Sequence, residues 1–168
     1  QHFDFLENVF ISGTQLIGGS SALDDILMDG CHIYFDGLSV GYHDEGNINA
    51  VIQDTRLRGD FSPLYMRSYS LLNSLIVSKS GDSKMIYSQE PETGFVGYIS
   101  SGNAYHYLGT KPSPFQVEAV GYFSFAGWKA RYSTDADSTY STSLPTANSV
   151  HVYPNEYKAG RGNIVIWN

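Results

Sequence analysis

The sequence predicts an all-β protein in which a short parallel β-solenoid precedes a small antiparallel β-sandwich or cap. The first observation is composition: of 168 residues, 42 % are hydrophobic and only 16 % are charged, with 17 Gly and 13 Tyr. The second is a repeat within residues 1–80, and the third is an alternation of apolar and polar residues later in the chain. Together they argue against a helical bundle, a coiled coil and a disordered chain.

Charge and cysteine content narrow the possible functions. The net charge is −7, of which −6 lies in residues 1–80, and this disfavours general binding of nucleic acid. The single cysteine, Cys31, excludes an internal disulfide framework and a cysteine-based zinc site. The apolar runs are too short to span a bilayer, and no signal peptide is recognisable. We therefore expect no cofactor and no membrane partner, and stability from packing, including packing between chains.

Residues 1–80 contain four similar segments, at 6–11, 28–33, 52–57 and 71–76. Each begins with an apolar residue, has Asn, Gly or Asp third and a small or β-branched residue fourth, and ends with Ile or Leu. Stacked coils of short strands joined by tight turns match this pattern. The third position is where the chain would turn through a left-handed conformation. The alternative is a chance rhythm in an ordinary β-sandwich with irregular strands.

Residues 81–168 differ in composition, so we expect a unit boundary near residues 79–82, where turn-forming residues gather. Apolar and polar residues alternate over 117–125, 150–153 and 163–167, which is typical of antiparallel strands. A long turn is predicted between the last two strands, and residues 135–149 are predicted as a surface loop. This second unit is therefore expected to be a small β-sandwich or cap.

The first coil begins within a few residues of Gln1, with no helix or polar cap before it. Its unpaired strand edges would promote aggregation in an isolated protein. We therefore expect this chain to be the C-terminal piece of a longer protein.

At this point the sequence resembles a known family. The phrases at residues 8–13 and 73–77 are similar to the coils of bacteriophage tailspikes and tail fibres, and of pectate-lyase-like proteins generally. The ending at residues 163–168 resembles the last strand of a tailspike cap. The resemblance implies a right-handed parallel β-helix over residues 1–80 and a C-terminal β domain over 81–168 that closes or trimerises it.

The same resemblance implies a homotrimer in the virion tail, outside the cell, with bacterial capsule or O-antigen polysaccharide as its ligand and often depolymerase activity. It places no catalytic motif on individual residues of this chain. A secreted, non-viral carbohydrate-active enzyme or carbohydrate-binding module remains the alternative, and such a protein is expected to be monomeric.

If the four segments align, alternate positions of each strand face outward. One row then contains Phe10, His32, Arg56 and Leu75, and the next contains Ser12, Tyr34, Arg58 and Val77. Because neighbouring coils lie about 4.8 Å apart, the His and Tyr would lie beside the two Arg side chains. Arg binds carboxylate in a forked geometry, so the four residues are candidates for binding an acidic sugar. The alternative is a solvated face with ordinary surface charges.

Asp36 and Asp60 lie 24 residues apart, at matching places of neighbouring coils, and are the candidate catalytic pair. Glycoside hydrolysis uses two carboxyls about 5 to 9.5 Å apart. A lyase would instead use a His or Tyr base with an Arg to neutralise the uronate. Asp29 and Asp54 fall near the turn position, where Asp commonly caps backbone amides. A complete active site could also lie on coils outside this sequence.

Two other clusters are open to more than one interpretation. Residues 43–45, His-Asp-Glu, could ligate a metal, but three consecutive strand residues cannot all face one ion, so a surface turn is expected. The aromatic clusters at 105–107 and 122–128 fit a core or a threefold contact better than a glycan groove. Within them, Trp128 is the candidate for stacking on a sugar.

Overall fold

A computed structural model describes residues 2–11, 13, 15–19, 24–34, 36–42, 47, 49–81, 83–91, 96–154 and 157–167. The structure is mostly β, with one short helix, α1 (Phe125–Tyr132). Within those residues, no helix has the length and apolar character needed to cross a membrane. The predominance of strands over the single short helix confirms the all-β prediction.

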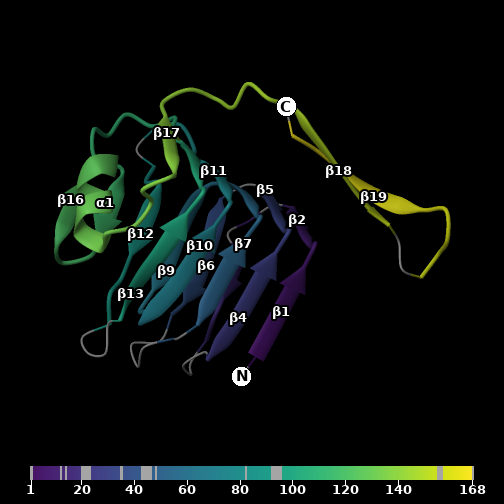
Figure 1. Ribbon diagram of the computed structural model, residues 1–168, viewed down its shortest axis with the longest axis horizontal. Helices are drawn as coiled ribbons and strands as arrows, with labels where there is room; N and C mark the ends of the chain where they lie inside the picture. The colour runs from purple at the N-terminus through teal and green to yellow at the C-terminus, as the bar shows by residue number, and fades with distance from the viewer. Residues whose placement is uncertain are drawn as a thin grey trace.

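Most strands belong to three parallel sheets that run side by side along the molecule (Figure 1). Sheet A contains β1 (His2–Leu6), β4 (Asp25–Asp29), β7 (Ala50–Gln53), β10 (Ser68–Leu72) and β13 (Gly97–Ser101). Sheet B contains β2 (Val9–Ile11), β5 (His32–Tyr34), β8 (Arg56–Arg58), β11 (Leu75–Val77), β14 (Ala104–His106) and β17 (Thr139–Ser141). Sheet C contains β3 (Gln15–Ile17), β6 (Gly37–Gly41), β9 (Asp60–Leu64), β12 (Ile86–Ser88), β15 (Phe115–Val117) and β16 (Gly121–Phe123). The chain thus passes through sheets A, B and C in turn, and each such passage is called a coil below.

The predicted alignment of the second, third and fourth coils is confirmed by the register, which pairs Met28 with Ile52 and Ile52 with Leu71. The alignment of the first coil is wrong by one residue, because Phe5 rather than Leu6 pairs with Met28. The shift arises because Glu7, and not Asn8, takes the left-handed conformation, with φ of 53°. The side chain of Asn8 instead closes the turn by donating to the Leu6 carbonyl at 3.0 Å.

The same turn position recurs in every later coil. Gly30, Asp54, Asn73 and Gly102 occupy it with φ of 61°, 49°, 49° and 67°. Each turn still joins the stack, since the amides of Gly30, Asp54 and Asn73 donate to carbonyls of the following coil at 2.9 to 3.2 Å. Gly30, Asp54 and Asn73 therefore have the predicted role, whereas Asn8 does not, and Gly102 extends the series into a fifth coil.

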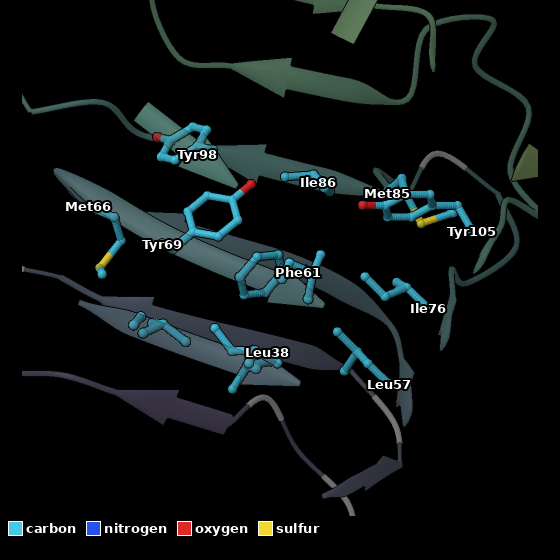
Figure 2. Packing of buried hydrophobic residues seen from close by; sticks show 14 of the residues in the cluster. Leu38, Leu57, Phe61, Met66, Tyr69, Ile76, Met85, Ile86, Tyr98 and Tyr105 are labelled. Carbon is cyan, nitrogen blue, oxygen red and sulfur yellow. The ribbon is translucent and has the colours of Figure 1, made fainter. Parts of the chain in front are cut away.

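The space enclosed by the three sheets is filled by rows of inward side chains from successive coils (Figure 2). In sheet B one such row is Ile33, Leu57, Ile76 and Tyr105, all exposed by 2 % or less. Sheet C contributes an equivalent inward row, to which Leu38 belongs. The core becomes aromatic toward the fifth coil, where Tyr98, Tyr105, Phe115 and Trp128 pack together.

The three sheets continue past residue 80, where the sequence predicted a unit boundary, because β12 to β15 extend the same stack. The turn residues Asn73 and Gly102 are 29 positions apart, whereas Asp54 and Asn73 are 19 apart. This longer spacing hid the fifth coil from the sequence pattern. Within the described part of the chain, antiparallel pairing joins only β15 to β16 and β18 (Ser149–Pro154) to β19 (Gly162–Trp167).

The prediction of one alternating strand over residues 117–125 is wrong. A turn at residues 118–120, with Ala119 at φ of 60°, reverses the chain into β16. Helix α1 follows at once, and its N-cap Ser124 accepts a hydrogen bond from the Gly127 amide at 3.2 Å. Together, β16 and α1 lie at the end of the stack beside the fifth coil (Figure 1).

The last two strands form the antiparallel hairpin that their alternation predicted. This hairpin projects from the body of the molecule, as Figure 1 shows. The end of the hairpin opposite its turn lies against the second coil, where the Tyr34 hydroxyl donates to the Ile166 carbonyl at 2.8 Å. The hairpin is therefore attached to sheet B, far along the sequence from the coil that it contacts.

Substituting Gly37 by Ala tests the close approach between coils. Gly37 has φ of 116°, and a Cβ there would lie 2.4 Å from the Asp60 carbonyl oxygen. We expect Gly37→Ala to lower the free energy of unfolding by about 2 kcal/mol or more beyond the cost of backbone strain. The control is Gly97→Ala, because Gly97 has φ of 133° but no atom within 4 Å of the added Cβ. Urea denaturation of both variants measures the difference, and equal losses would contradict a steric contact.

Candidate functional site

The outer face of sheet B carries the predicted row of sugar-binding residues. The register pairs His32 with Arg56 and Arg56 with Leu75, as the sequence predicted. Tyr34 and Arg58 occupy the parallel row two residues further along these strands. In the first coil, Val9 and Ile11 take the places expected for Phe10 and Ser12, because of the one-residue shift. Ser12 itself lies outside the described residues.

A cleft of about 400 Å³ lies between this face and a later segment of the chain. Its floor is formed by Arg56, Arg58, Leu75, Val77, Ala104 and His106, and its wall by residues 144–147, Ser149 and Trp167. His106 Nδ1 lies 2.7 Å from the Ser143 carbonyl oxygen, which can only accept, so Nδ1 carries a proton. The cleft thus combines cationic and imidazole groups with an aliphatic floor and an aromatic edge.

Arg56 and Arg58 are two of the residues that the sequence predicted for the sugar, and both line this cleft. Neither forms an ion pair with any described residue. Arg56 Nε is buried and has no hydrogen-bond partner among the described atoms. A buried donor without a partner costs free energy, which an anionic ligand in the cleft could recover. The forked guanidinium geometry suits a carboxylate, sulfate or phosphate oxygen pair.

His32 and Tyr34, the other two predicted contacts, lie beneath the C-terminal hairpin. His32 is only 1 % exposed. The Tyr34 ring stacks on Trp167, with ring centroids 4.6 Å apart and planes inclined by 24°. While the hairpin is in place, the His32 ring is inaccessible to a ligand, and Trp167 covers one face of the half-buried Tyr34 ring. Trp167 therefore covers Tyr34, the aromatic residue predicted to contact the sugar, and lines the cleft in place of Tyr34.

Trp128 belongs to the core. It lies in α1, is completely buried, and packs on Phe115 with ring centroids 5.3 Å apart. A second aromatic side chain, Tyr132, meets it edge-on at 4.6 Å. No face of the indole is available to a sugar, because the helix turns it toward the fifth coil.

The proposed catalytic pair does not line a common cleft. Asp36 lies just before β6 and forms an exposed ion pair with Lys79 at 2.5 Å. With Arg58 and Ser80, these two residues line a pocket of about 320 Å³. Asp60 is not part of that lining.

Asp60 is half-buried at the start of β9, and the register pairs it with Gly37 rather than with Asp36. Its Oδ2 accepts a hydrogen bond from the Lys84 amide at 3.4 Å, while its Oδ1 is buried and has no hydrogen-bond partner among the described residues. Burial raises the pKa of this carboxyl, and the nearby backbone donor and lysines oppose the rise. The offset between Asp36 and Asp60 shows that the 24-residue spacing does not bring them to equivalent positions.

The candidate metal ligands at residues 43–45 lie outside the described residues. Among the residues that the structure describes, no group of three or more His, Cys, Asp or Glu side chains could hold a metal ion. The thiol of Cys31 is buried, and burial raises its pKa.

Sequence reasoning did not place Trp167, His106 or residues 144–147 at this site. Alternation along residues 163–167 indicated that Trp167 shares a face with Val165, but no local pattern indicated the coil to which that strand returns. Comparison of the chain with protein-family models, curated proteins and solved structures finds no significant match.

The two tryptophans give a direct test of these assignments. In a Trp167→Phe variant, the core residue Trp128 is the only tryptophan, and we expect its emission to be blue-shifted and several-fold more weakly quenched by acrylamide than that of a free indole. In Trp128→Phe, the remaining half-buried Trp167 should be quenched more readily. Free access of acrylamide to Trp128 would contradict its place in the core.

Proposed function

We propose that this chain binds acidic polysaccharide of the bacterial surface, as the C-terminal region of a phage tailspike or tail fibre located in the virion tail. The observation that carries the proposal is the pair Arg56 and Arg58, side by side in a cleft and without ion pairs among the described residues.

We further propose that the coils form a right-handed parallel β-helix, as in such tailspikes. Three parallel sheets with one strand per coil are the arrangement that this fold requires. Connections between parallel strands of one sheet are right-handed in about 98 % of cases, because strand twist favours that direction. The same hand in every coil would keep the outward rows aligned along the axis.

The composition of the cleft favours a sugar acid over nucleic acid. The net charge of −7 would repel a polyphosphate from most of the surface, whereas two arginines can hold a single carboxylate. The aliphatic floor and the edge of Trp167 suit the apolar face of a pyranose ring. A bacterial polysaccharide with uronic acid or pyruvyl groups has this combination of charge and ring faces.

We restrict the proposal to binding. Asp36 and Asp60 do not line one cleft, so the acid and nucleophile of a glycosidase are not assembled at the cleft of Arg56 and Arg58. Binding alone accounts for the arrangement of this face.

We propose that the chain assembles as a homotrimer through the exposed face of its hairpin. Four aliphatic side chains share that face, with exposed fractions from 57 % to 64 %. They are Val150, Val152, Ile164 and Ile166. A two-stranded hairpin is marginally stable in water, and exposed apolar patches typically mark contacts between chains. A second copy on this face would bury it.

The cleft is tested by neutralising its arginines one at a time. A glycan array of bacterial polysaccharides identifies the ligand, and titration calorimetry measures its affinity. We expect acid-bearing glycans to bind, and Arg56→Gln and Arg58→Gln each to weaken binding about 10- to 100-fold through loss of a charge-assisted hydrogen bond.

The control is Arg161→Gln, which removes the same charge from an exposed position near the hairpin tip, outside the cleft. It should leave the affinity unchanged. Preference for neutral glycans, or equal losses in all three variants, would contradict the proposed site.

Assembly is tested by sedimentation equilibrium. The wild-type chain should sediment as a trimer, and Val152→Lys with Ile164→Lys should raise the dissociation constant at least about a hundredfold, because each ammonium loses its water in the contact. Ile99→Lys is the control, since Ile99 is 63 % exposed on sheet A. A monomeric wild-type chain at high concentration would favour the alternative, a carbohydrate-binding module that acts alone.

A further inference from the structure

Three residues of the C-terminal hairpin surround the buried imidazole of His32: Trp167, Tyr153 and His151. We propose that this hairpin is a proton-sensitive strap, which covers sheet B at neutral pH and is released when His32 is protonated. The proposal rests on the proposed function only where it concerns the cleft, because Trp167 forms part of the cleft wall.

The hydrogen bonds determine which imidazole nitrogen carries the proton. Trp167 Nε1 lies 2.7 Å from His32 Nδ1, and an indole N–H can only donate, so Nδ1 must be unprotonated. The Tyr153 hydroxyl donates its single proton to the Gly30 carbonyl at 3.0 Å. At 2.5 Å from His32 Nε2, the same hydroxyl oxygen therefore accepts from Nε2–H. The docked hairpin requires a neutral His32 with its proton on Nε2.

Protonation breaks this arrangement. A proton on Nδ1 would point at the indole N–H of Trp167, so that hydrogen bond would be lost and two donors would face each other. Only 1 % of His32 is exposed, so water cannot solvate the resulting charge. The imidazolium could form only by moving the hairpin strand that carries Trp167 away from the sheet.

The charged and titratable neighbours reinforce the effect. Arg56 of β8 is cationic, and the His151 ring of β18 lies 4.7 Å from the His32 ring. Cys31 precedes His32, Tyr34 ends the same strand β5, and Glu7 lies near Tyr153. Among the described residues, no carboxylate forms an ion pair with His32. Burial, His151 and Arg56 all disfavour a positive charge on the ring.

Burial, followed by His151 and Arg56, lowers the pKa of His32 from 6.5 to about 4. In the released hairpin the imidazole regains water and loses His151 as a neighbour, so its pKa rises back toward 6.5. Docking is therefore strongest above pH 6.5 and weakens by about tenfold for each pH unit below that value, until about pH 4. The same pH range opens the cleft, since Trp167 and Ser149 of the hairpin form part of its wall.

Hydrogen exchange of the unliganded protein tests the strap directly. After correction for the intrinsic pH dependence of exchange, amides of β18 and β19 should lose protection between pH 6.5 and pH 4, while amides of β8 and β11 stay protected. His32→Asn should remove this pH dependence, because the new side chain does not titrate. His151→Asn is the matched control in the same cluster, and it should retain most of the dependence.

Imidazole ¹⁵N spectra provide a measurement that needs no variant at position 32. At pH 7 the His32 signals should show the tautomer protonated on Nε2. A protonated Nδ1 at pH 7, unchanged protection down to pH 4, or loss of the pH dependence in His151→Asn would each overturn the proposal. These readouts involve no glycan, so their failure leaves the test of Arg56 and Arg58 intact, and a failure of glycan binding leaves the strap intact.

Discussion

The stacking of one coil on the next at constant register is the constraint on which the structure depends. In the first four coils the amide of the turn residue donates to a carbonyl of the next coil, and a left-handed residue stands at that place in all five coils. Asn103 shows how strictly the stack is satisfied: its side chain donates to the Leu71 carbonyl and accepts from the Ser74 amide, at 2.8 and 2.9 Å. Once the register is set, inward rows become the core and outward rows become aligned ladders.

The end of the stack determines what those ladders can do. The fifth coil is filled with aromatic rings, and Trp128 of α1 closes it. Asp135 is buried there and accepts hydrogen bonds from Tyr105 and Asn103, so the chain leaving the helix is held against the last coil. From this point β17 adds to sheet B, and the chain runs back along that sheet. The cleft exists because this return path places residues 144–149 and the hairpin above the outer face.

One cationic side chain links the two activities that we propose. Arg56 lines the cleft as a donor for an anion, and its charge also lowers the pKa of His32 beneath the hairpin. Trp167 likewise has two contacts, one with the His32 imidazole and one with the cleft. The proposed binding and the position of the hairpin would thus be coupled through shared residues, because the two sites occupy adjacent coils of one sheet.

The sequence by itself determined the coil repeat, the turn residues and register of the second to fourth coils, and the adjacency of His32 and Arg56. Each of these depends on patterns within about one coil, which local turn and burial preferences specify. Only the tertiary structure decided which outward residues stay accessible: Arg56 remains in a cleft, whereas His32 is covered by Tyr153 and Trp167, 121 and 135 positions away. It also decided that Trp128 is core, through a turn at residues 118–120 that a period-two pattern conceals. Contacts over such separations follow from the path of the whole chain, which no local pattern encodes.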